Sequence, residues 1–177
     1  SLSYLGRLDG VFDTSVNAAL EIGFSAARGR TGPTDVLLSA LADPNLIAPP
    51  QPGGHLESAL DGVDVTWKWK PRERNVYRSF LWQTEWLRNR RQVESLLPSS
   101  SLARDVVTTS GGYSYIEGQF TKRWRAGARF DYSGLPGGSN ATERGAALVA
   151  RWVLSEFQEF RFQAGFLRRN DAAAAKR

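Results

Sequence analysis

The sequence predicts an all-β fold of antiparallel, up-and-down strands, and three observations support this prediction. Apolar and polar residues alternate with a period of two along most of the chain, as they do when successive side chains point to opposite faces of a strand. Several alternating segments are about ten residues long, which exceeds the usual length of a globular strand. Short connections alternate along the chain with long ones that are rich in Gly, Pro and Ser.

Eight segments carry the alternation and are expected to form the strands. In chain order they cover residues 2–12, 16–26, 63–70, 79–86, 113–120, 124–132, 145–154 and 160–166. The apolar positions of the second to fourth segments are Val16, Ala18, Leu20, Ile22, Phe24, Ala26, Val63, Val65, Trp67, Trp69, Phe80, Trp82 and Trp86. Those of the sixth and eighth segments are Trp124, Ala126, Ala128, Phe130, Tyr132, Phe160, Phe162, Ala164 and Phe166. A helix would spread each set around its circumference, so the extended conformation is favoured.

The connections divide the chain into strands over residues 1–171 and a C-terminal tail over residues 172–177. Long loops are expected at 29–61, 91–110 and 134–144. Brief turns on one side and extended loops on the other are typical of transmembrane β-barrels of the outer membrane.

Composition restricts the class of protein. The chain has 177 residues, 41% of them hydrophobic, and a net charge of +5, which fits one folded domain. Its apolar stretches are much shorter than the roughly 20 residues of a membrane-spanning helix. It has no cysteine and a single histidine, which excludes thiolate metal sites, His clusters and His-based triads. We therefore expect no catalytic residues, no metal, no cofactor and no enzymatic activity.

Aromatic residues on the apolar sides favour a membrane setting. They gather toward the ends of strands, and a ring with one polar edge suits the boundary between hydrocarbon and headgroups. The expected lipid-interface aromatics are Trp67, Trp69, Trp82, Trp86, Trp124, Tyr132 and Trp152. The alternative is that these rings form the core of a soluble barrel.

The polar sides of the strands carry formal charges as well as Ser and Thr. In a membrane barrel this side lines a watery interior, where charges are tolerated and pair across strands. The residues expected to face such a lumen are Glu21, Asp64, Lys68, Glu85, Glu117, Arg125, Arg129, Asp131 and Arg161. The alternative is the solvated outer face of a soluble sheet.

A basic cluster lies where the fourth expected strand enters the second long loop. In a barrel this position is the extracellular rim, where Arg88, Arg90 and Arg91 are candidates for contact with the phosphates of lipopolysaccharide. Solvated loop charge is the alternative. Nucleic acid is not an expected partner.

Several segments share a barrel-strand signature. They are 64–71 (Asp-Val-Thr-Trp-Lys-Trp-Lys-Pro), 77–85, 112–115, 123–132, 155–157 and 160–163. This signature resembles that of porin-like Gram-negative outer-membrane β-barrel proteins, which are sometimes labelled TonB-dependent outer-membrane receptors. The resemblance implies an up-and-down transmembrane β-barrel in the bacterial outer membrane, in contact with outer-membrane lipid and lipopolysaccharide. No plug domain or TonB-box-like segment is visible in the sequence, so energy-coupled uptake is not expected.

The chain is expected to be an internal part of a larger barrel. If the short connections are periplasmic, both chain ends are extracellular, whereas a self-contained barrel has its termini in the periplasm. The chain also has no methionine, and it ends Ala-Lys-Arg instead of on the aromatic residue usual for a last barrel strand. The alternative is that the eight strands close into a small complete barrel, since the number is even.

The expected function is that of a passive channel for small hydrophilic solutes or ions, with wall charges biasing entry. Other barrel segments or protein subunits are further expected partners. Two alternatives remain open. One is a structural barrel with a filled lumen that binds partners through its loops, and the other is a soluble lipid-binding barrel with its apolar face inward.

Overall fold

The computed structural model describes residues 3–31, 55–72, 77–96, 102–135 and 141–170. The regular structure of these residues consists of strands alone. The strands are β1 (Tyr4–Ser15), β2 (Ala18–Thr31), β3 (Leu56–Trp69), β4 (Ser79–Leu96), β5 (Leu102–Gln119), β6 (Trp124–Gly134), β7 (Thr142–Ser155) and β8 (Gln158–Asn170). A search of the described residues finds no helix of the length and hydropathy needed to cross a membrane.

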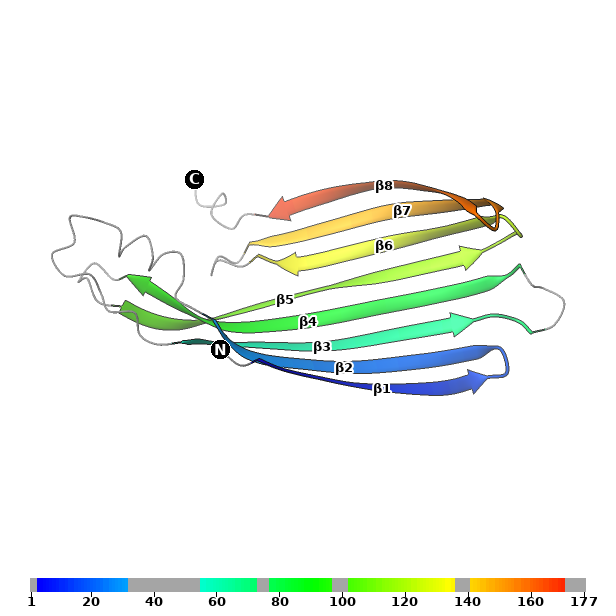
Figure 1. Ribbon diagram of the computed structural model, residues 1–177. Coiled ribbons are helices and arrows are strands. Elements are labelled where there is room, and N and C mark those ends of the chain that lie inside the picture. The colour runs from blue at the N-terminus through cyan, green and yellow to red at the C-terminus, as the bar shows by residue number, and fades with distance from the viewer. Residues whose placement is uncertain (1–2, 32–54, 73–76, 97–101, 136–140, 171–177) are drawn as a thin grey trace.

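The strands form one antiparallel sheet in chain order (Figure 1). Each strand pairs with the next, so β1 and β8 are the edges, and within the described residues no pairing joins these two strands. The start of β1 and the end of β8 lie at the same end of the sheet (Figure 1), which we call the loop end. The opposite end, where β1 turns into β2, is the turn end. The prediction of eight antiparallel, up-and-down strands is confirmed, whereas the sheet is open and not a closed barrel.

The register gives each face of the sheet its own character, because residues directly opposite each other on neighbouring strands point to the same face. One row across β2 to β8 runs Leu20, Trp67, Trp82, Ile116, Ala128, Leu148 and Ala164. We call the face with this row the apolar face. The other face, which we call the polar face, contains the row Glu21, Thr66, Gln83, Tyr115, Arg129, Ala147 and Gly165.

The strands extend into ranges that the sequence predicts to be loops. β4 and β5 have 18 residues each, and their pairing continues to Leu96 and Leu102, inside the expected loop 91–110. The loops expected at 29–61 and 134–144 are shortened in the same way, because β2, β3, β6 and β7 run into them. The hydrogen bonds of an antiparallel ladder join backbone groups, so Gly, Ser and Arg continue a strand without an apolar side. Alternation detects only the part of a strand that has one apolar face.

Connection lengths follow the expected alternation only in part. The turn-end connection 70–78 is longer than the loop-end connection 97–101. β3 pairs with β4 only as far as Arg91, so residues 92–96 of β4 pair with β5 alone. The β4–β5 hairpin therefore projects at the loop end as paired strands.

This single-layer sheet has little interior. The buried side chains among the described residues are Ala18, Leu56, Thr66, Glu117, Ala141 and Val149. Thr66, Glu117 and Val149 lie on the polar face, which is the more enclosed of the two. On the apolar face, Leu148 is 68% exposed and Phe162 is 56% exposed. In the part of the chain described here, no second layer covers the apolar face.

Candidate functional site

All nine charged residues predicted to face a lumen lie on the polar face. They occupy four successive rows, which from the turn end contain Arg125 and Arg161, then Lys68 and Glu117, then Glu21 and Arg129, and then Asp64, Glu85 and Asp131. The register therefore brings charges from distant parts of the sequence onto one surface. Whether this surface faces a lumen depends on closure of the sheet, so that role stays a prediction.

One ion pair on the polar face bridges two strands across a glycine. The Nη1 atom of Arg7 on β1 lies 3.0 Å from Oδ1 of Asp64 on β3, and β2 passes between them at Gly23. Arg7 also pairs with Asp9 at 2.7 Å. A Cβ atom at Gly23 would lie 2.7 Å from the Arg7 guanidinium. The missing side chain of Gly23 thus provides the space for this contact.

A second network has the same design on the other half of the sheet. Glu117 on β5 accepts hydrogen bonds from Arg151 on β7, and β6 passes between them at Gly127. The Tyr115 hydroxyl donates to the same carboxylate, and Nη1 of Arg125 lies 3.9 Å from it. The Glu117 side chain is only 8% exposed. This carboxylate is the centre of the most enclosed charged group on the polar face.

Sequence reasoning missed Arg151, although alternation contained the signal. Arg151 is directly opposite both Arg125 and Arg161, so three arginines form one row across β6, β7 and β8. Its neighbours on the same side of β7 are Val149 and Val153. Because both are apolar, the sequence of this strand does not show which side is the polar one. The Nε atoms of Arg125 and Arg151 are buried and have no hydrogen-bond partner among the described residues.

The remaining pairs on the polar face are more open to solvent. Lys68 Nζ lies 3.3 Å from Glu21 Oε2 across β2 and β3. Arg129 pairs with Asp131 two residues along the same strand at 2.7 Å, and its guanidinium lies 4.4 Å from the centroid of the Tyr113 ring. Charges of both signs therefore lie side by side in the middle of the surface, between the arginine row near the turn end and the row of Asp64, Glu85 and Asp131 nearer the loop end.

The seven aromatic residues predicted for the lipid interface all lie on the apolar face. Near the turn end, Trp124 stacks on Trp152 with ring centroids 5.8 Å apart. Near the loop end, Trp86 stacks on Tyr132 at 5.7 Å. Trp124 and Tyr132 are about 27 Å apart along an extended strand, and a tilt of about 40° reduces this to roughly 20 Å. That separation is close to the height of the apolar band of outer-membrane barrels, about 25 Å.

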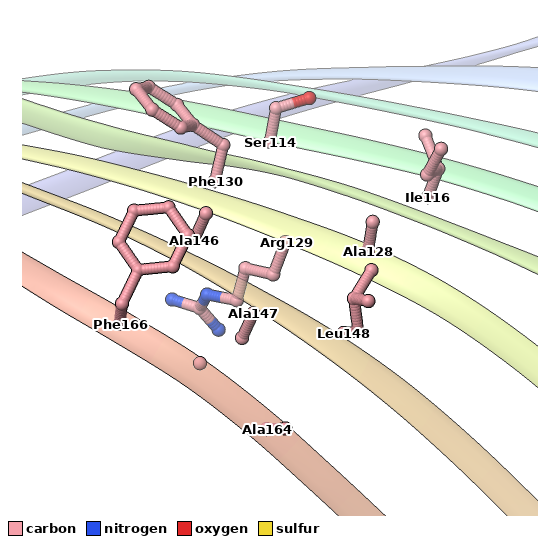
Figure 2. Close-up of a pocket in the computed structure, with 11 residues that line it drawn as sticks. Ser114, Ile116, Ala128, Arg129, Phe130, Ala146, Ala147, Leu148, Ala164 and Phe166 are labelled. Carbon is pink, nitrogen blue, oxygen red and sulfur yellow. The ribbon is translucent and has the colours of Figure 1, made fainter.

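A shallow apolar groove lies between these two aromatic levels. Its volume is about 720 Å³. Phe130 and Phe166 stand at one end and Ile116 and Leu148 at the other, as Figure 2 shows. The small side chains between them are Ser114, Ala128, Ala146 and Ala164. The hollow forms because small side chains lie between large ones.

The three rim arginines are divided between the faces. Arg88 and Arg90 lie on the apolar face, one and two rows beyond Trp86, whereas Arg91 lies on the polar face opposite Ser58 and Val107. Strand alternation separates neighbouring residues in this way, because pairing continues past Arg91. Only Arg88 and Arg90 share a face with the aromatic residues, and the contact of the three arginines with lipopolysaccharide stays a prediction.

Within the described ranges, no group of three or more His, Cys, Asp or Glu side chains is placed to hold a metal ion. Comparison with known proteins gives no match to a family model, to a curated protein or to a solved structure.

Proposed function

We propose that this chain forms part of a transmembrane β-barrel in a Gram-negative outer membrane and acts as a passive channel for small hydrophilic solutes or ions. The observation that carries the proposal is the division of one sheet into two faces, of which the apolar one is left exposed. Soluble proteins rarely expose contiguous apolar patches of more than a few hundred Å². In a bilayer the same face would meet hydrocarbon, and its aromatic residues would meet the two interfaces.

The polar face supports the second half of the proposal. Glu117 and Thr66 are buried on this face, so the charged side of the sheet is the less exposed of the two, which favours an inward position for it. A soluble lipid-binding barrel requires the opposite arrangement, with the apolar side enclosed. An enclosed charged wall suits water and dissolved ions.

The proposed mechanism is passive permeation along a charged wall. Lys68, Arg125, Arg129 and Arg161 attract anions, and Arg151 adds to the same basic region. The opposing carboxylates are Asp64, Glu85, Glu117 and Asp131. Glu117 is bound by Arg151 and Tyr115, which compensate its negative charge. It should therefore repel an anion less than the other three acids do. We expect anions to be preferred near the arginine row.

A second candidate function is a structural barrel with a filled lumen. The observation that favours it is the pair of networks, Arg7 with Asp64 and Glu117 with Arg151, that lie across the polar face and join alternate strands. Side chains that pair across strands fill the interior of small barrels. A filled barrel would bind partners through its loops and would not conduct.

Planar-bilayer recording of the complete barrel that contains this chain, as wild type and as Arg125→Glu/Arg129→Glu, tests the channel proposal. We expect discrete conductance steps from the wild-type barrel and a shift of the reversal potential toward cation preference in the double variant, because two wall cations become anions. Arg72→Glu/Arg123→Glu, which makes the same charge change in turn-end connections, is the matched control and should shift the potential much less. Absence of steps from the wild-type barrel, or equal shifts in both variants, contradicts the proposal.

A further inference from the structure

One row of the apolar face joins the aromatic level near the loop end to a pair of arginines. Trp86 stacks on Tyr132 across β5, where Gly112 leaves room between the rings. The guanidinium of Arg144 on β7 lies 5.7 Å from the centroid of the Tyr132 ring. Arg168 on β8 is directly opposite Arg144. The row thus places two cations beside interfacial aromatic rings.

The positive charges of Arg144 and Arg168 are not balanced by carboxylates of the described residues. Side chains directly opposite on neighbouring antiparallel strands have Cβ atoms about 5 Å apart, and like charges there are destabilising. Among the described residues, neither guanidinium forms an ion pair with a carboxylate, and the nearby Glu143 belongs to the polar face. By contrast, Arg28 at the same end of the apolar face is 2.6 Å from Asp61. An anion from outside the described chain would relieve the repulsion between Arg144 and Arg168.

The groove begins one row nearer the turn end. Phe130, Ala146 and Phe166 form that row, and two residues along a strand correspond to about 7 Å. A charged group held by the arginines would therefore stand directly above an apolar hollow. Only an amphipathic molecule with an anionic head and an aliphatic tail fits both features at once.

We propose that Arg144 and Arg168 bind a phosphomonoester of an acylated lipid whose acyl chain lies in the groove. Two guanidinium groups complement the nearly double negative charge of a phosphomonoester, and each guanidinium matches phosphate with a two-pronged set of donors. This inference rests on the proposed function, because there the loop end faces the outer leaflet. The lipid of that leaflet with phosphomonoesters and several acyl chains is lipid A, the anchor of lipopolysaccharide.

Native mass spectrometry of the complete barrel in detergent micelles tests the site, with diphosphoryl lipid A as the probe. We expect Arg144→Gln/Arg168→Gln to weaken binding at least about tenfold, because each charge-assisted contact contributes on this scale. Arg144→Lys/Arg168→Lys keeps both positive charges but lacks the paired donors of a guanidinium. Its affinity for lipid A should therefore lie between those of the wild type and of the glutamine variant. Arg72→Gln/Arg123→Gln removes two arginines from the turn-end connections and should bind as wild type. Tryptophan emission verifies that each variant is folded.

Three results would overturn the inference. These are wild-type binding by Arg144→Gln/Arg168→Gln, equal binding of dephosphorylated lipid A, and complete displacement of lipid A by inorganic phosphate, which would indicate an anion site without a lipid component. Failure here is distinct from failure of the channel. A barrel that conducts in planar bilayers but binds lipid A independently of these arginines keeps the proposed function and loses only the lipid site.

Discussion

The Glu117 network gives a quantitative prediction for stability. Glu117→Gln removes the charge that Arg151 and Tyr115 share, while the shape of the side chain is kept. Breaking a fully buried pair costs about 3–5 kcal/mol, but Arg151 is 25% exposed and has Glu159 at 3.7 Å as a second partner. We therefore expect a loss of about 2 kcal/mol in the free energy of unfolding.

Urea unfolding of the chain reconstituted in lipid vesicles, followed by tryptophan emission, measures this loss. Glu21→Gln is the matched control, because Glu21 pairs with Lys68 on the same face. The Glu21 side chain is 36% exposed and the Lys68 side chain 62% exposed. Exposed pairs contribute at most about 1 kcal/mol. The double variant Glu117→Gln/Arg151→Gln should lose less than the sum of the two single variants, since the second change removes a cation that the first has deprived of its main partner. Equal losses from Glu117→Gln and Glu21→Gln, or strict additivity in the cycle, would refute the reasoning.

Two further predictions concern the glycine bridge and the orientation of the faces. Gly23→Ala should lower the urea midpoint relative to Gly6→Ala, because a Cβ atom at Gly23 would meet the Arg7 guanidinium at 2.7 Å whereas one at Gly6 meets nothing within 4 Å; equal midpoints would show that the ion pair across β2 does not need this space. Because the chain has no cysteine, spin labels at Ala128→Cys and Arg129→Cys report neighbouring positions on opposite faces without background. In vesicles we expect the first label to collide with dissolved oxygen and the second with a water-soluble nickel complex, and the reverse result would place the charged face toward lipid.

Strand alternation predicted the faces well because it is a local property. The alternation assigned the tryptophans from Trp67 to Trp152 to one side of the strands and the charged residues from Glu21 to Arg161 to the other. The register places each of these residues on the face to which it was assigned. A slip of one residue would reverse a strand, and the apolar side chains oppose such a slip. The two-residue period is therefore sufficient to assign a face without knowledge of the partner strand.

Contacts between strands that are two apart could not be predicted in this way. The pairing of Arg7 with Asp64, and of Arg151 with Glu117, depends on register across an intervening strand, and the first pair also uses the space left by Gly23. The ends of the strands are set by backbone pairing, which Gly, Ser and Arg can continue. For this reason the β4–β5 hairpin is longer than its alternating portion.

The edges of the sheet connect the fold to the two candidate functions. In hydrocarbon, the unpaired backbone groups of β1 and β8 would each cost several kcal/mol, so a membrane setting requires a strand partner for both edges. β1 runs from the loop end to the turn end and β8 runs back, so the two edges are antiparallel and suit direct pairing or any even number of intervening strands (Figure 1). Barrel diameter grows with strand number, and eight strands leave only enough space for side chains, whereas 16 or more leave an aqueous channel. The number of strands in the complete barrel would therefore decide between a filled scaffold and a pore. The same polar face would pack the interior of a small barrel or line the channel of a large one.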